Sequence, residues 1–390
     1  MSGGEHVSTR VRRWWRDGPM HRPGGPRRYV TVAVVVALLV SLPAIVGAIP
    51  VSAKKIPVAT LLARVMASEQ VKYTGLASAS GALQIPDLGV GTDIPALLSG
   101  TNRLRAWWNG PTSYRVDRVT FAAESDVYRN GEQIWTWDSD HRIAVLTAGK
   151  PQIPLPGPQD ALPGNLARRL LAQAKPADLH MAGARRIAGH TVLAMTWKPN
   201  DARSTISQVT VWVDQDNGLP LSVEVRSISG GRAFSSSFLD IHFASPDPSV
   251  LTFDPSKDKT AVVENTEPGA PQSAAATFTL PHTIGDLPEG LPERSPPSPL
   301  IATYGTGPTI VAVTALDPQA AGALEGQINS PGHPPVKGAF GSGALIETPL
   351  ITGLIFATNT NGYVLLGTVT RDQIEAMALY LVSHPARQIP

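Results

Sequence analysis

The stretch TNRLRAWWNGPTSYRVDRVTFAAESDVYRNGEQIWTWDSDHRIAVLTA, residues 101–148, decides the fold of this chain. Its Asn-Gly pairs at 109–110 and 130–131 are typical of tight hairpin turns, and each is flanked by alternating apolar and polar residues. Residues 138–140 supply a third turn. A sheet built this way buries one face and exposes the other to water. The pattern predicts consecutive antiparallel strands near residues 102–108, 113–121, 124–129, 132–137 and 142–147.

Further strands and two short helices are predicted on both sides of this stretch. Apolar residues at helical spacing, among them Leu61 and Val65, predict an amphipathic helix over 57–69, and a second helix is expected over 164–174. We therefore expect one α+β domain over residues 57–258, with helices packed on an open antiparallel sheet. Its other strands are expected near residues 71–83, 180–187, 191–198, 206–214, 219–227 and 232–243.

A second, smaller α+β domain is predicted over residues 278–390. The segment 259–277 has the proline- and alanine-rich composition of a linker and separates the two domains. A terminal helix is expected over 371–383, with Thr370 as its N-cap and Gln373 at the capping-box position. The strands of this domain are expected near residues 300–304, 309–314, 344–348, 354–359 and 363–369.

The N-terminus carries a basic segment followed by an apolar one. Residues 1–28 hold seven arginines, and residues 29–53 contain an uncharged apolar run of about the 20 residues that a membrane-spanning helix needs. This order predicts a cytoplasmic N-terminus and an extracytoplasmic bulk. Two outcomes stay open: a retained membrane anchor, or a signal peptide cleaved after Ala53 that releases an exported protein. Met20 is an alternative start.

Composition excludes several classes of function. The net charge of +2 is concentrated in the first 28 residues, and the remainder carries about −3, so no basic surface for nucleic acid is expected. The chain has no cysteine, which excludes disulfide bonds and a thiol nucleophile. The folded part must therefore be held together by its own hydrophobic core.

Motifs for catalysis or metal binding are missing from the sequence. The histidines lack metal-ligand spacing, and Gly-x-Ser-x-Gly does not occur. The glycines of residues 305–308 are followed by proline and predict a turn, since a dinucleotide loop needs a different glycine pattern. Residues 214–218 begin like a calcium loop but lack the downstream glutamate, so a hairpin turn is expected there. We expect no enzyme, no cofactor and no metal.

Four carboxylates of the predicted meander keep a hydrolase open as a third alternative. A retaining glycosidase needs two carboxyl groups only about 5 Å apart. The sequence shows no such pairing, and we expect all four side chains on solvated strand faces. They are Asp117, Glu124, Asp126 and Asp138.

Several segments resemble known families. GEQIWTWDSDHRIAVL (131–146) resembles a strand pair of LolA-type lipoprotein carriers, and QVTVWVDQDNGLPLSVEV (208–225) resembles their later hairpin, which ends in Gly-Leu-Pro. The closing LTFDPS (251–256) is similar too. In the second domain, YGTGPTIVAV (304–313) and NGYVLLGTVTRDQIEAMALYLV (361–382) are similar in order to the C-terminal domain of RseB/MucB-type sigma-factor regulators.

The resemblance implies an open antiparallel half-barrel whose concave side is plugged by helices. Between helices and sheet it implies an apolar cavity for lipid or lipoprotein acyl chains. For the RseB type it also implies binding to a membrane-spanning anti-sigma factor. This chain departs from both families in carrying its own predicted membrane segment, which is not expected of a freely diffusing shuttle.

The resemblance turns several apolar strand positions into expected cavity residues. The face that bears Trp135 and Trp137 is expected to look toward the helices of residues 57–69 and 164–174. The expected lining comprises Leu61, Val65, Trp135, Trp137, Leu193, Met195, Trp197, Val209, Val211 and Val213.

The neighbouring Trp107 and Trp108 are expected to point to opposite faces of their strand. One of them is then half-exposed, and we expect it to contact a partner or the membrane.

The leading hypothesis is therefore a non-enzymatic, extracytoplasmic protein that binds lipid or lipoprotein acyl chains and relays the state of the envelope to an anti-sigma factor. The alternative is a regulatory protein-interaction module whose sheet has a dry core and no lipid ligand.

Overall fold

The computed structural model describes residues 53–82, 97–120, 124–148, 157–257, 262–266, 278–290, 301–329 and 334–388. All of these belong to the unit formed by residues 51–390. The predicted segments 1–28 and 29–53 lie outside the described residues, apart from Ala53. Within the described ranges, no helix has both the length and the apolar character that crossing a membrane requires.

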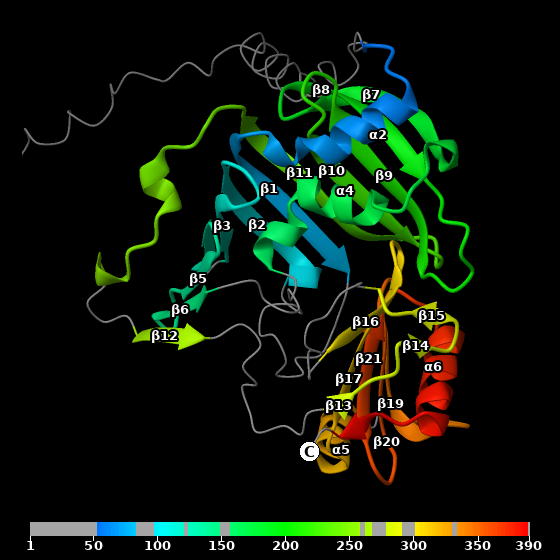
Figure 1. The fold of residues 1–390 in the computed structure, drawn as a ribbon. Helices are drawn as coiled ribbons and strands as arrows, with labels where there is room; N and C mark the ends of the chain where they lie inside the picture. Colours follow the sequence, from blue (N-terminus) through cyan, green and yellow to red (C-terminus); the bar gives the residue numbers. More distant parts are fainter. Residues whose placement is uncertain are drawn as a thin grey trace, which may run out of the picture. The chain divides into compact units, whose positions relative to one another are not determined.

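A twelve-stranded sheet is the main element of the fold (Figure 1). Its strand order is β12-β6-β5-β4-β3-β2-β1-β11-β10-β9-β8-β7, so β12 and β7 are outer strands and the sheet is open. All neighbours pair antiparallel except β12, which is parallel to β6. The bounds are β1 Tyr73–Ala82, β2 Ser99–Trp108, β3 Ser113–Val119, β4 Glu124–Asn130, β5 Gln133–Asp138, β6 Ile143–Ala148, β7 Leu179–Ile187, β8 His190–Trp197, β9 Ile206–Asp214, β10 Pro220–Ser227, β11 Arg232–His242 and β12 Val262–Thr266.

Two short helices cover one face of the β7–β11 half of this sheet (Figure 1). They are α2, Val58–Ala67, and α4, Pro163–Leu171. Each buries an apolar stripe, Leu61 and Val65 in α2 and Leu171 in α4. Helices of about ten residues are marginal alone, so packing on the sheet stabilises them.

A six-stranded antiparallel sheet follows, with helices on both of its faces. Successive residues of its strand β20 point to opposite sides. Leu354 packs with Met377 of α6, and Ile355 packs with Ala321 of α5. In the order β16-β17-β21-β20-β19-β18, the strands are β16 Ala302–Thr306, β17 Thr309–Leu316, β21 Gly362–Gly367, β20 Thr352–Ala357, β19 Gly341–Glu347 and β18 Val336–Gly338, and the helices are α5 Pro318–Ile328 and α6 Arg371–Ser383.

The predicted fold class is confirmed: a large open antiparallel sheet with few helices, and a smaller sheet with its own helices. The predicted turn at 214–218 is confirmed as a hairpin turn, in which Asp214 Oδ1 accepts the backbone N–H groups of Asp216 and Asn217 at 2.9 and 3.0 Å. Gly131 has the positive φ of +62° that its hairpin turn requires.

Three local expectations differ from the structure. Helix α5 was not predicted, although Asp317 caps it by accepting the N–H of Gln319 at 2.8 Å. Strand β12 lies inside the segment expected to be a linker. Thr370 is the N-cap residue of α6, but no side-chain hydrogen bond closes the capping box, because Gln373 donates to Asp286 instead.

Candidate functional site

The face of the large sheet beneath α2 and α4, here called the helix face, brings together eight of the ten predicted lining residues. The three of them in β8 lie opposite the three valines of β9, and two residues of α2 complete the same cluster. All eight side chains are at most 6% exposed and pack against one another. They are Leu61, Val65, Leu193, Met195, Trp197, Val209, Val211 and Val213.

An aromatic ladder continues this face across the first three strands. The ring of Tyr73 stacks on Trp108 at a centroid distance of 6.2 Å, and Trp108 stacks on Tyr114 at 4.8 Å. The indole N–H of Trp108 donates to the carbonyl of Glu69 at 2.8 Å, just after α2. Sequence reasoning missed Tyr73 and Tyr114 as part of this face. The hairpin register carries the signal, since it places both opposite Trp108.

Trp135 and Trp137 lie on the opposite face of the sheet, here called the outer face. Trp135 pairs across the strands with Tyr128, and both tryptophans contact the ring of Phe253, at centroid distances of 5.1 and 5.9 Å. It is their neighbour Ile134 that packs against the helix-face core. The expected orientation of Trp135 and Trp137 toward the helices is therefore wrong.

Trp107 and Trp108 lie on opposite faces, as expected. Trp108 is only 3% exposed and belongs to the helix-face core. Trp107 is half-buried on the outer face, where the guanidinium of Arg115 lies 4.9 Å from its ring centre. Of the two residues predicted to contact a partner or membrane, Trp107 is the one that keeps exposed surface.

Arg115 is the centre of a polar cluster on the outer face. Its Nε and Nη2 donate to the two oxygens of Asp117 at 2.6 and 2.8 Å, and Nη2 also donates to Asp126 Oδ2 at 3.1 Å. The guanidinium lies between the rings of Trp107 and Tyr128, 4.7 Å from the centre of the latter. Bidentate pairing and aromatic stacking together fix the position of this side chain.

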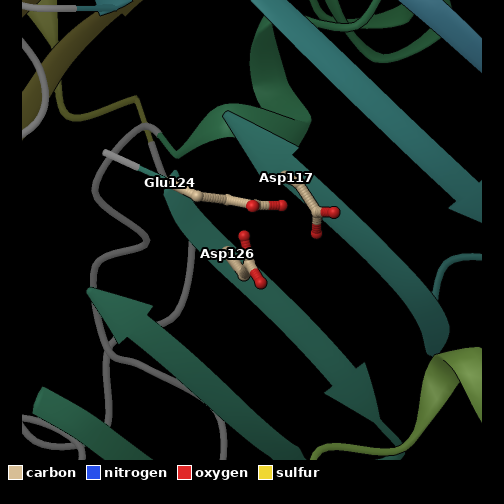
Figure 2. Close-up of side chains that lie close together, drawn as sticks. All are labelled: Asp117, Glu124 and Asp126. Atoms are coloured by element: carbon tan, nitrogen blue, oxygen red, sulfur yellow. The ribbon is translucent and has the colours of Figure 1, made fainter. Parts of the chain in front are cut away.

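Three carboxylates converge around this guanidinium. Figure 2 shows Asp117 on one strand pointing toward Glu124 and Asp126 on the next, and one oxygen from each lies within 4.8 Å of the others. Asp117 is fully buried and Asp126 is 4% exposed, so the expectation of solvated side chains is wrong for these two. Asp138 is different: it is the half-exposed last residue of β5, and its carboxylate lies 2.9 Å from the imidazole of His141.

Burial and crowding change the protonation of the cluster. Burial raises the pKa of Asp117 to about 6, and the hydrogen bonds from Arg115 offset part of this effect. Burial also raises the pKa of Asp126 to about 7, and the charge of Asp117 adds to the rise. Asp126 Oδ1 is buried without a hydrogen-bond partner among the described residues. The cluster therefore tends to hold a proton near neutral pH.

The geometry of the cluster does not suit a hydrolase. The catalytic carboxyl group of a glycosidase must reach its substrate. Asp117, however, is fully buried and accepts two hydrogen bonds from Arg115. The three carboxylates also match the oxygen donors that divalent cations prefer. A cation there would have to displace the guanidinium, so we assign the cluster to structure and to proton binding.

A groove of about 330 Å³ lies where the end of β10 meets the smaller sheet. The backbone N–H of Thr205 donates to the carbonyl of Thr368 at 3.1 Å, and the N–H of Thr370 donates to Arg203 at 2.7 Å. Ile228, 59% exposed, is one of the groove's lining residues. The lining is mixed, with Thr205, Ile228, Ser229, Glu347, Thr348, Pro349, Thr352, Thr370, Arg371 and Asp372.

Comparison with protein families identifies one segment of the chain. Residues 122–245 match the family model described as the MucB/RseB N-terminal domain. This segment runs from β4 to β11 and includes both the outer-face carboxylates of β4 and the helix-face residues of β8 and β9. The expected similarity to RseB/MucB-type proteins is thereby confirmed for this segment. No curated protein matches the sequence.

The comparison with solved structures finds similarity to proteins from several bacteria, among them the following three. The complex of MucA and MucB from Pseudomonas aeruginosa is 17% identical over 86% of this chain and 100% of that chain, with a TM-score of 0.49. LprF from Mycobacterium bovis is 10% identical over 49% of this chain and 96% of that chain, with a TM-score of 0.30. The LolA-superfamily protein NE2245 from Nitrosomonas europaea is 12% identical over 51% of this chain and 98% of that chain, with a TM-score of 0.20.

Proposed function

Because residues 122–245 match the model of the MucB/RseB N-terminal domain, we propose that this chain is a non-enzymatic, extracytoplasmic regulator that binds the outer segment of a membrane-spanning anti-sigma factor. The family match is the observation that carries the proposal. The basic segment before the apolar run at 29–53 supports an extracytoplasmic location for the folded part.

The packing of the helix face supports a protein partner over a lipid. Leu61 and Val65 of α2 are fully buried against the sheet, and Val209, Val211 and Val213 are fully buried beneath them. An acyl chain would have to displace this packing, since buried side chains at native density leave little free space. A protein partner needs no such rearrangement, because it binds the surface.

We propose the groove at Ile228 as the surface that the partner contacts. The groove combines the exposed apolar Ile228 with the polar Glu347, Arg371 and Asp372, and protein interfaces show such a mixture of apolar and polar contacts. The groove is lined by residues of both sheets, so a bound segment would contact both of them. Such an arrangement suits a regulator that binds its partner reversibly.

Binding to the extracytoplasmic segments of anti-sigma factors tests the function directly. We expect the extracytoplasmic segment of one anti-sigma factor from the same genome to bind the full chain. Titration calorimetry measures the dissociation constant. Ile228→Asp is expected to weaken this binding by at least about tenfold, which is ~1.4 kcal/mol, because an exposed apolar contact of the groove is replaced by a charge. The purified variant should keep the unfolding temperature of the wild type.

Leu239→Asp is the matched control, since Leu239 is 52% exposed on the same sheet but lies outside the groove. It is expected to bind like the wild type. Equal weakening by both substitutions would exclude the groove as the contact surface. Failure of every anti-sigma segment to bind would overturn the proposed function itself.

Binding of lipid or lipoprotein acyl chains is the second candidate. It is favoured by the gathering of eight expected lining residues, six on the sheet and two on α2, beneath short helices that could lift from the sheet. Each buried methylene gains about 0.8 kcal/mol, so a dozen would offset part of the cost of opening. Native mass spectrometry of the purified full chain should then show a bound lipid, and Leu193→Asp should abolish it.

A further inference from the structure

A second groove, of about 520 Å³, lies open to solvent at the start of α2. One side is the segment 53–57, which leads into the helix, and the other is the outer strand β7 with Leu193 of β8. Apart from Lys54 and Lys55, every lining side chain is apolar or glycine. This groove shares no lining residue with the groove at Ile228.

An irregularity of β7 exposes an apolar side chain on this groove. The register with β8 shifts between Met181 and Ala184, and Gly183 between them has a positive φ of +107°. Met181 is 43% exposed, whereas its cross-strand partner Met195 is buried. Packing within the fold therefore does not account for a methionine at this position. Flexible methionines are typical of adaptable apolar binding surfaces.

Positive charge lies along one side of the groove. Lys55 is exposed, and Lys54 pairs with Asp216 at 2.6 Å with both side chains more than half exposed. Such an exposed ion pair is worth little and exchanges readily for another anion. Beyond the groove, β7 continues into the exposed Arg186, whereas the guanidinium of Arg185 lies 3.9 Å over the ring of Trp212. An apolar floor with a cationic rim matches an amphiphile that has an anionic head.

The position of the groove in the chain indicates where such an amphiphile would come from. Ala53 is both a lining residue and the last residue of the predicted apolar segment 29–53. If that segment spans the membrane, residues 53–57 emerge at its surface, and tethering makes contact with lipid headgroups effectively intramolecular. Basic residues beside a membrane segment are attracted to anionic lipid.

We propose that this groove is a contact site for the membrane surface, in which Lys54 and Lys55 bind the phosphates of anionic phospholipids and Met181 and Ile56 enter the apolar layer beneath them. The contact would fix the orientation of the β7 edge toward the bilayer. It rests on the predicted apolar segment and is independent of the partner proposed above.

The full chain reconstituted in lipid vesicles tests this contact. Because the chain has no cysteine, Met181→Cys gives a single labelling site, and Leu239→Cys gives a control at a similarly exposed residue of the same sheet. The vesicles contain phosphatidylcholine with spin-labelled acyl chains, with or without phosphatidylglycerol. We expect lipid quenching of the fluorophore at 181, strengthened by phosphatidylglycerol, and little quenching at 239.

Lys54→Gln and Lys55→Gln probe the charges without disturbing buried contacts. Each is expected to lower the contact equilibrium, taken from the quenched fraction, about fivefold, in line with the attraction of one basic residue to an anionic surface. The proposal is overturned if the chain does not associate with vesicles, if labels at 181 and 239 are quenched equally, or if quenching at 181 ignores phosphatidylglycerol. In vesicle-free protein, a change in the fluorescence of the label at 181 on adding an acidic peptide would assign the groove to a protein partner instead.

Discussion

Arg115 shows how one residue organises a whole strand face. Its guanidinium binds Asp117 and Asp126 and is held between two aromatic rings. Three carboxylates nevertheless surround it, and Arg105 lies 3.7 Å from Glu124. Buried negative charge that is not fully paired is costly, and protonation is the route by which proteins relieve it.

The raised pKa values of Asp117 and Asp126 predict that stability falls as pH rises. Between the unfolded value of 3.8 and the folded values of about 6 and about 7, the folded state holds protons that the unfolded chain has lost. The free energy of unfolding then decreases with pH over this window, by about 1.4 kcal/mol per pH unit for each proton held. Urea unfolding between pH 5 and 7 measures the slope.

Asp126→Asn is expected to reduce that slope, because the amide cannot titrate. Asp240→Asn, at an exposed aspartate of β11, controls for the substitution and should keep the wild-type slope. Asp201 works in the opposite sense: hydrogen bonds from Arg203 lower its pKa to about 2, so its contribution is lost only as the pH falls below about 4. A wild-type slope that is flat or positive between pH 5 and 7 would contradict the assignment.

At the scale of elements, the β9–β10 turn holds α2 in place. Gly218 has a φ of +79°, and a Cβ there would lie 2.6 Å from Cβ of Arg64 in α2. The same arginine donates to the carbonyl of Gln215 at 3.1 Å. The turn and the helix therefore fit together only because residue 218 has no side chain.

Gly218→Ala is expected to destabilise the fold by about 2–4 kcal/mol, combining the cost of a positive φ with the clash against α2. Gly230→Ala is the matched control: it also has a positive φ, +92°, but nothing lies within 4 Å of the added Cβ. It should cost only about 1 kcal/mol. Thermal unfolding of both variants gives the difference, and equal losses would show that the turn does not position the helix.

The elements also show what the sequence can predict. Alternation and Asn-Gly turns predicted β2 to β6, since these signals are local in the chain. Alternation alone does not predict which residues from elsewhere in the chain cover each face of β5. The bulk of Trp135 and Trp137 favoured the helix side, but Phe253, more than a hundred residues away, provides a second apolar cluster on the outer face. The converging carboxylates depend in the same way on the register between β3 and β4.

At the scale of the whole molecule, the two sheets meet through a short polar seam. Thr205 donates its hydroxyl to the carbonyl of Leu350, and Ser204 donates to that of Pro308 at 3.0 Å. Leu350 and Ile351 of the smaller sheet's turn pack with the core of the large one. Because the seam joins both cores, we expect the described part of the chain to unfold as one cooperative unit.

The tryptophans allow this coupling to be measured, because all eight precede residue 213 and none lies in the smaller sheet. In the wild type, tryptophan fluorescence and calorimetry are expected to give one common midpoint. Thr205→Val leaves the Leu350 carbonyl without its buried donor, a loss of about 1–3 kcal/mol at the seam, so the two midpoints should separate. Thr210→Val, on β9 away from the seam, should leave them together. Coincident midpoints in Thr205→Val would mean that the apolar contacts of Leu350 and Ile351 couple the sheets without the polar seam. A partner bound at Ile228 would then have to act on both sheets through these two residues.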